Sequence, residues 1–119
     1  MKFSTVLIVE DEKIVGLHLA SILQRIGYIV VDVVSTGMEA VEIASVKKPD
    51  VILMDIGLSG ELDGIEASRK IQQNIDIPVV FISGNSDQAS IEKAMEGNAY
   101  GYIFKPFDER EIRHVLGIA

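Results

Sequence analysis

The chain has 119 residues, a net charge of −7 and no cysteine, and 48% of its residues are hydrophobic. This length predicts one domain, residues 1–119, that is large enough to bury a core. The composition excludes disulfides and thiolate metal sites, the acidic balance argues against direct nucleic-acid binding by this domain, and without a membrane span or a signal region the expected location is the cytoplasm.

Five short apolar runs alternate with amphipathic segments along the chain. The runs are rich in Val and Ile and nearly continuous, which is typical of strands that are buried on both faces of a sheet. We therefore predict parallel strands. They are Thr5–Val9, Ile29–Val34, Val51–Met54, Val79–Ile82 and Tyr102–Phe104.

The segments between the runs have the apolar spacing of helices. The first carries Leu19 and Ile22 on one stripe, and Gly27 is expected to end it. Asp63 with Glu66 three residues later resembles a capping box. The predicted helices are Lys13–Ile26, Gly37–Val46, Gly64–Ile75, Asp87–Met95 and Asp108–Leu116.

Five such βα units indicate a parallel five-stranded sheet with helices on both faces, which is a three-layer doubly wound α/β sandwich. An eight-stranded barrel would need about twice as many residues. Pattern alone leaves the strand order open. We favour the flavodoxin-like order 2-1-3-4-5, because it brings the polar strand ends together.

Polar residues follow the strands at their carboxyl ends, where open α/β sheets bind ligands. In the proposed order, strands 1, 3, 4 and 5 are neighbours about 4.8 Å apart, so these side chains meet at one rim. They are Glu10, Asp11 and Glu12 after the first strand, Asp55 after the third, Ser83 and Gly84 after the fourth, and Lys105 and Pro106 after the fifth.

Three carboxylates on one rim, those of Glu10, Asp11 and Asp55, repel one another, and the single charge of Lys105 cannot neutralise them all. Hard carboxylate oxygens predict Mg²⁺, with Mn²⁺ as an alternative. The neighbouring hydroxyl of Ser83 and the charge of Lys105 suit a phosphoryl ligand. Asp55 can then act as its nucleophile, because aspartyl phosphates are known covalent intermediates.

Alternative interpretations remain at this point. Each polar motif alone could be a helix cap or a solvated turn, but together they would have to coincide at four strand ends. A flavin-binding electron carrier of similar topology would need a hydroxyl-rich loop after the first strand, where this chain has acids. A phosphatase with an aspartate nucleophile generally carries a second acid two residues later, where this chain has Gly57.

The motifs resemble those of the receiver domain of two-component response regulators, and the likeness covers essentially the whole chain. The residues that carry it are Val6–Glu12, Met54–Ile56, Ile82–Gly84 and Lys105–Phe107. The resemblance implies a signalling domain rather than an enzyme, one that catalyses its own phosphoryl transfer and slow dephosphorylation.

The resemblance also assigns roles around the metal. Asp55 is expected to accept the phosphoryl group from phosphohistidine on a sensor histidine kinase or phosphotransfer protein. Asp11 and Asp55 are expected to bind the metal together with the backbone carbonyl of Gly57, and Glu10 is expected to act through a bound water.

Four further residues are implied in switching. Ser83 corresponds to the switch hydroxyl, next to Gly84, and Lys105 to the lysine that pairs with the phosphoryl group. Tyr102 corresponds to the aromatic residue that turns inward on activation. The Lys105–Pro106 peptide bond is expected to be cis.

The implied partners dock on two surfaces. The output surface is the fourth helix, fifth strand and fifth helix, with an unknown output domain or protein as its partner. Kinases or phosphotransfer proteins dock on the first helix in this family, where Ile14 and Leu17 lie off the apolar stripe. The chain is expected to be a monomer or a weak homodimer. The output residues are Ile91, Met95, Tyr102 and Arg113.

Several positions depart from the family pattern. Glu10 stands where an aspartate is more common. Ser59 stands where the family usually has a proline, four residues after Asp55, and Asp63-Gly64 comes one residue late. The replacement at position 10 bears on the metal geometry. The two loop changes bear on the rigidity and partner contacts of the loop after Asp55, and they leave the predicted role of Asp55 unchanged.

Overall fold

A computed structural model describes residues 3–84, 92 and 99–117 of the chain. The five predicted strands are present, and four of the predicted helices fall within the described residues. The strands are β1 (Thr5–Val9), β2 (Ile29–Val34), β3 (Val51–Asp55), β4 (Val79–Ser83) and β5 (Ala99–Phe104). The helices are α1 (Lys13–Arg25), α2 (Gly37–Lys47), α3 (Gly64–Gln72) and α5 (Glu109–Val115).

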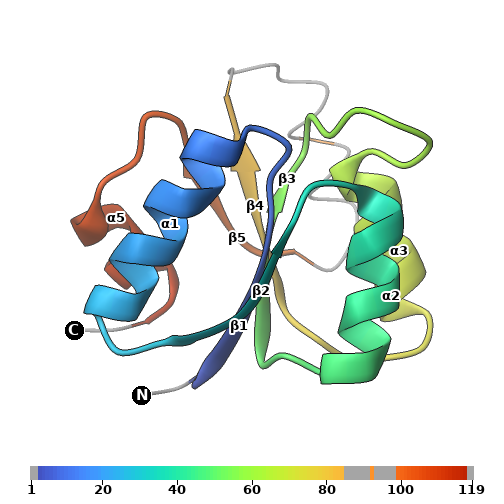
Figure 1. Cartoon of the computed structure of the whole chain (residues 1–119), viewed down its shortest axis with the longest axis horizontal. Coiled ribbons are helices and arrows are strands. Elements are labelled where there is room, and N and C mark those ends of the chain that lie inside the picture. The colour runs from blue at the N-terminus through green and yellow to red at the C-terminus, as the bar shows by residue number, and fades with distance from the viewer. Residues whose placement is uncertain (1–2, 85–91, 93–98, 118–119) are drawn as a thin grey trace.

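The strands form one parallel sheet in the order β2-β1-β3-β4-β5, as predicted. Helices α1 and α5 cover one face of the sheet, and α2 and α3 cover the other (Figure 1). A separate hydrophobic cluster fills the space under each pair of helices. The fold is therefore the three-layer doubly wound sandwich expected from the sequence.

The central strands explain why their sequences are continuous apolar runs. Every residue of β3 and of β4 is buried, and these strands contribute side chains to both hydrophobic clusters. A strand with a layer of helices on each face has no solvent side, so it lacks the alternation of an exposed strand. The first polar residues of these strands, Asp55 and Ser83, stand at their carboxyl ends.

Some element bounds differ from the prediction. β5 begins at Ala99, three residues before the predicted start, because it pairs with β4 from Val79 onward. Helix α3 ends at Gln72 rather than Ile75. The Gln72 side chain donates a hydrogen bond to the Ile77 carbonyl (3.0 Å), just before Pro78, where the chain leaves the helical conformation. The predicted helix Asp87–Met95 lies outside the described residues.

Local capping fixes where the helices near the site begin and end. Asp63 and Glu66 form the predicted capping box, in which each side chain accepts from the other residue's backbone N–H. Gly27 follows α1 with φ +104°, the left-handed conformation that a helix-ending glycine adopts readily. These caps fix the ends of the segments that lead into the sheet.

The outer edge of the sheet is covered by polar groups from the same chain. β2 lies at the edge, and Lys47 from the end of α2 donates a hydrogen bond to the Val31 carbonyl (3.1 Å). Lys47 also pairs with Asp32 (3.7 Å), whose carboxylate accepts from the Val33 N–H (2.8 Å). Two backbone polar groups of the edge strand are thus engaged by side chains.

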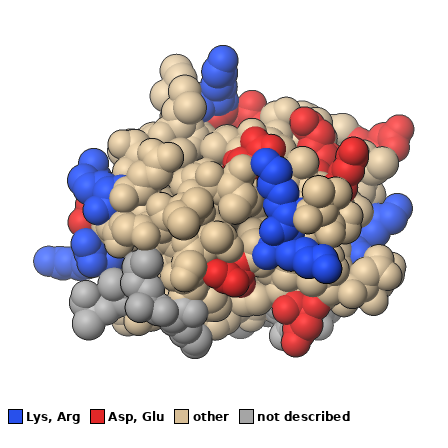
Figure 2. Space-filling view, turned by 60° about the horizontal axis from the view of Figure 1, so that its bottom comes forward, with Lys and Arg blue, Asp and Glu red and all other residues tan. Residues whose placement is uncertain are grey.

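Acidic and basic side chains are interspersed with other residues on the face in Figure 2, which brings forward the end of the molecule opposite the carboxyl ends of the strands. Within the described part of the chain, no helix has the length and apolar character needed to cross a membrane.

Asp50 joins the start of β1 to the loop before β3, and it provides a test of this packing. Its carboxylate accepts hydrogen bonds from the backbone of Ser4 (2.9 Å) and Thr5 (3.0 Å), which lower the pKa of Asp50 below its ordinary value of 3.8. We expect Asp50→Ala to lower the free energy of unfolding at neutral pH by about 1 kcal/mol, because both donors lose a charged acceptor.

The pH dependence of this effect has a definite sign. A carboxyl group whose pKa is lowered by folding stabilises the protein above its unfolded pKa, and that stability is lost as the pH falls through the folded pKa. The difference in the free energy of unfolding between wild type and Asp50→Ala, measured in urea, should therefore become smaller as the pH falls below about 4. A difference that stays constant from neutral to acidic pH would show that the charge of Asp50 is not responsible.

Candidate functional site

The candidate site lies at the carboxyl ends of β1 and β3, where the predicted acids meet. Val9 of β1 pairs with Met54 of β3, so the residues that follow them, Glu10 and Asp55, emerge side by side. Together with Asp11, each offers one carboxylate oxygen, and these oxygens all lie within 4.8 Å of one another. Glu10 and Asp55 are buried, whereas Asp11 is exposed.

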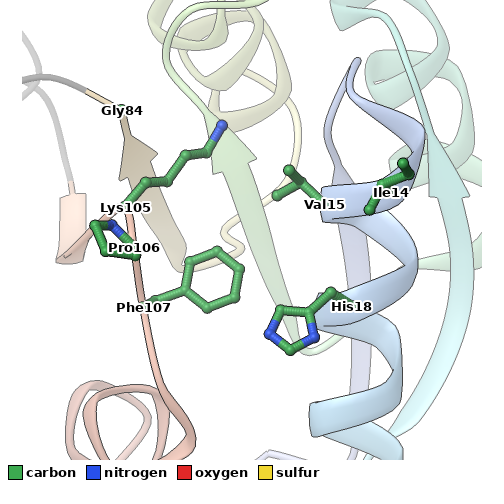
Figure 3. Close-up of a pocket in the computed structure, with 7 residues that line it drawn as sticks. All are labelled: Ile14, Val15, His18, Gly84, Lys105, Pro106 and Phe107. Atoms are coloured by element: carbon green, nitrogen blue, oxygen red, sulfur yellow. The ribbon is translucent and has the colours of Figure 1, made fainter.

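Lys105 reaches this cluster from the end of β5 (Figure 3). Its amine forms ion pairs with Glu10 (2.9 Å), Asp55 (3.5 Å) and Glu12 (3.7 Å). The backbone of Lys105 also donates to the Ser83 carbonyl (2.9 Å), which extends the β4–β5 ladder to the rim. The Lys105–Pro106 peptide bond is cis.

One cation therefore serves three acids, and both burial and these contacts shift the pKa values in the cluster. Burial raises the pKa of Glu10 from 4.5 to about 7, and the hydrogen bonds from Lys105 and from the Glu12 backbone offset only part of the effect. Burial alone would lower the pKa of Lys105, but the hydrogen bond to Glu10 and the charges of Asp55, Glu10 and Glu12 outweigh it and raise the pKa. Additional positive charge is the natural complement of this cluster.

The loop after β3 holds two of the acids in place by backbone hydrogen bonds. The Gly57 N–H donates to Asp55 Oδ1 (3.0 Å), and the Ser59 N–H donates to Asp11 Oδ2 (3.3 Å). Lys105 faces the other oxygen of Asp55, Oδ2. The carboxylate of Asp55 is thus fixed between a backbone donor and a lysine.

These residues fit a hard divalent cation. The group that can hold one is Glu10, Asp11 and Asp55, all oxygen donors, with one member at the surface where water can complete the coordination. Gly57 lies beside them, because its N–H donates a hydrogen bond to Asp55 Oδ1.

Ser83 and Tyr102 lie on one side of the sheet. Tyr102 pairs with Phe81 across β4 and β5, and their rings stack with centroids 6.0 Å apart. Ser83 is two residues beyond Phe81, so it points to the same face, and it is buried at the strand end. Burial raises the pKa of the partly buried Tyr102. The structure thus places the predicted hydroxyl and the predicted aromatic residue on one face.

An apolar groove of about 500 Å³ opens next to the lysine (Figure 3). One wall is α1, and the other is the segment that follows β5. The exposed His18 stacks on Phe107 across it, with ring centroids 5.6 Å apart. The residues that line the groove are Ile14, Val15, His18, Gly84, Lys105, Pro106 and Phe107.

His18 and His114 are both exposed. Sequence reasoning placed Ile14 and Leu17 off the apolar stripe of the first helix, and they are 83% and 56% exposed. It missed the stack of His18 on Phe107, because no local pattern links two aromatic rings that are far apart in the chain. It also missed the contact of Ser59 with Asp11.

Comparison with known proteins places this chain in one family. Residues 6–117 match the response regulator receiver domain, so the chain belongs to this family. The chain is similar to the transcriptional regulatory protein PdtaR of Mycobacterium tuberculosis, with 34% identity over 96% of this chain and 55% of PdtaR.

Two further proteins show the same relation. The transcriptional regulatory protein YbdJ of Bacillus subtilis is 39% identical over 94% of this chain and 48% of its own length. The signal receiver domain of a modulated diguanylate cyclase from Desulfovibrio desulfuricans has a TM-score of 0.90 and 33% identity, covering 97% of this chain and 91% of that one. The chain spans about half the length of the curated relatives it matches.

Proposed function

We propose that this receiver domain is a phosphorylation-dependent switch in which Asp55 accepts a phosphoryl group from phosphohistidine on a sensor histidine kinase or phosphotransfer protein. The observation that carries the proposal is the convergence of Glu10, Asp11 and Asp55 on one point, with Lys105 as their shared cation. The family assignment favours this function over the flavin carrier and the phosphatase.

The chain's own residues would carry out the transfer as follows. A carboxylate oxygen of Asp55 attacks the phosphorus, the P–N bond to the donor imidazole breaks, and the imidazole leaves with the bonding electron pair and takes up a proton. Mg²⁺, or Mn²⁺ in its place, would bind to Asp11, Asp55 and the Gly57 carbonyl, with Glu10 acting through water, and would supply charge that stabilises the phosphoryl oxygens. Lys105 would pair with one of these oxygens.

The buried carboxylate of Asp55 supports this role. Its fixed position, between the Gly57 N–H and the lysine, presents the nucleophile in one orientation. The pairing of three acids with the single amine of Lys105 supports the binding of a further cation here.

Switching would run through Ser83 and Tyr102. A phosphoryl group on Asp55 offers oxygens that the Ser83 hydroxyl reaches by moving toward them, and the Tyr102 ring then turns into the vacated space. The output surface would include Tyr102 and Arg113. The two residues Ile91 and Met95, also expected there, lie outside the described residues. The size of the shift is limited by the difference in phosphoryl interaction between the two arrangements.

The groove beside Lys105 would receive the phosphodonor protein, because it is apolar, exposed and next to the proposed acceptor. The output partner would belong to the part of a longer protein that the curated relatives have beyond this domain, or to a separate protein. A monomer or weak homodimer is consistent with either arrangement.

Phosphorylation of Asp55 can be measured directly. The purified protein incubated with Mg²⁺ and acetyl phosphate is expected to gain the mass of one phosphoryl group, and Asp55→Asn is expected to gain none, because the substitution removes the carboxylate that would act as the nucleophile beside the metal ligands and Lys105. Equal labelling of Asp55→Asn would refute the assignment.

Ser83→Ala serves as the matched variant in the same experiment. It is expected to accept the phosphoryl group on Asp55 but to lose much of the change around Tyr102 that beryllofluoride, a phosphoryl mimic, induces in the NMR spectrum of the wild type. The same response at Tyr102 in both proteins would mean that the switch does not run through Ser83.

A further inference from the structure

Ser59 contacts the metal-site residue Asp11 through two donors. Its backbone N–H and its hydroxyl both lie 3.3 Å from the same oxygen, Asp11 Oδ2. The two residues are 48 positions apart in the chain. Among the described residues no ion pair involves Asp11, and both hydrogen bonds to its carboxylate come from Ser59.

The path of the loop explains why Ser59 reaches Asp11. Ile56 and Leu58 are buried in the cluster under α2 and α3, whereas the alternate residues Gly57 and Ser59 are exposed. The buried pair anchors the loop, and the exposed pair faces the rim. Gly57 donates to Asp55 and Ser59 donates to Asp11, so one loop ties together carboxylates that belong to different strands.

We propose that Ser59 is a positioning residue for the metal site, which holds Asp11 turned toward Glu10 and Asp55 so that a divalent cation finds the three oxygens already assembled. This inference rests on the proposed function, since it concerns the same cation. An exposed carboxylate beside two other acids would otherwise rotate toward solvent, where repulsion is weaker. Two neutral donors on Oδ2 disperse its charge and leave Oδ1 available to the cation.

The residue type at this position matters for both donors. A proline has no N–H and no hydroxyl, so it can make neither hydrogen bond. An alanine keeps the N–H and loses only the hydroxyl, and a threonine keeps both. The series Ser, Thr, Ala and Pro therefore removes the donors to Asp11 one at a time.

The test is a Mg²⁺ titration of the full chain and its variants, followed by NMR shifts of the Asp11 side-chain carboxyl carbon. We expect Ser59→Pro to weaken Mg²⁺ binding about tenfold, at the low end of what loss of a residue supporting a metal ligand costs, and Ser59→Ala to weaken it less, about threefold, because the backbone donor remains. Ser59→Thr is expected to retain the wild-type affinity. Before any Mg²⁺ is added, the Asp11 signal of the alanine and proline variants should already differ from that of the wild type.

Ser45→Ala is the matched control, because Ser45 is also exposed and its hydroxyl donates to the Glu42 carbonyl (2.9 Å) on α2, outside the site. It should leave the Mg²⁺ affinity and the Asp11 signal unchanged. Thermal midpoints measured in EDTA identify a variant that has lost its fold. If Ser59→Pro does not fold, the comparison of Ser59→Ala with the wild type decides the test.

The outcomes separate this inference from the proposed function. Unchanged or tighter Mg²⁺ binding by Ser59→Ala, with a wild type that binds Mg²⁺, overturns the role of Ser59 and leaves the phosphoryl-accepting site intact. A wild type that shows no Mg²⁺-dependent shift at Asp11 overturns the metal site itself, and this inference with it.

Discussion

Gly64→Ala is expected to lower the free energy of unfolding by about 3 kcal/mol, although alanine is the better helix former. Gly64 is the first residue of α3, and a Cβ there would overlap the backbone carbonyl oxygen of Asp55 and lie 2.8 Å from its carbonyl carbon. It would also lie 2.9 Å from the Ile56 Cα, and none of these atoms belongs to a side chain that could rotate away.

The loss should appear as a fall in the thermal midpoint on the order of 10 °C. The backbone that must move belongs to Asp55 itself, and Gly64 is tied to it through the hydrogen bond to the Ile56 carbonyl (3.1 Å). We therefore also expect weaker phosphorylation at temperatures where the variant is still folded.

Gly57→Ala is the matched control for stability. A Cβ at Gly57 would meet only Asp55 Oδ1 at 3.8 Å, an ordinary contact, and its φ is not positive. Its thermal midpoint should stay within a few degrees of the wild type. If Gly64→Ala were equally well tolerated, the close packing of α3 on the end of β3 would be wrong.

Asp11→Asn is expected to remove most of the stabilisation that Mg²⁺ provides. A ligand that binds only the folded state stabilises it by about 2.7 kcal/mol at one hundred times its dissociation constant. The wild type should therefore unfold at a clearly higher temperature or urea concentration in excess Mg²⁺, and Asp11→Asn should show little of this gain because one of its three clustered carboxylates is neutral.

Without the metal, Asp11→Asn should stabilise the folded protein relative to the wild type. In EDTA, Asp11→Asn should raise the thermal midpoint, because it removes one of the three clustered carboxylate charges, and we expect a gain on the order of 1 kcal/mol at this exposed position. Calcium-free and magnesium-free controls fix the baseline. A Mg²⁺ response of the same size in both proteins would count decisively against a metal at these residues.

Much of the fold could be predicted from the sequence because the central strands β1, β3 and β4 are buried on both faces. Continuous apolar runs such as those of β3 and β4 report that environment directly, and the polar residue that ends each run marks the rim. The meeting of Asp55 with Glu10 followed from the strand order alone. The apolar pattern did not determine the strand order itself, which we favoured because it brings the polar strand ends together.

The start of β5 shows where local pattern fails. Ala99, Tyr100 and Gly101 do not resemble a strand, and glycine disfavours one. Gly101 nevertheless lies inside β5. A Cβ at this position would lie 2.8 Å from Val115 Cγ1 of α5, so the absence of a side chain lets the helix approach the strand closely. Only the packing of α5 on the sheet reveals this requirement.

The contact of Ser59 with Asp11 could not be predicted for a related reason. The sequence shows that a serine replaces the usual proline of the family, but the consequence depends on the alternation of buried and exposed residues in a loop. Burial of Ile56 and Leu58 decides which side chains face the rim, and this burial becomes visible only when the loop is packed.

The position of Lys47 at the edge of β2 affects how readily the protein would aggregate at high concentration. An open strand edge is a template on which another molecule can add its own strand, the first step toward fibrils and precipitates. Here the Val31 carbonyl and the Val33 N–H are engaged by Lys47 and Asp32, and an arriving strand would have to displace both side chains and desolvate their charges. The side chains of Lys47 and Asp32 thus protect this edge of the sheet against indiscriminate strand pairing.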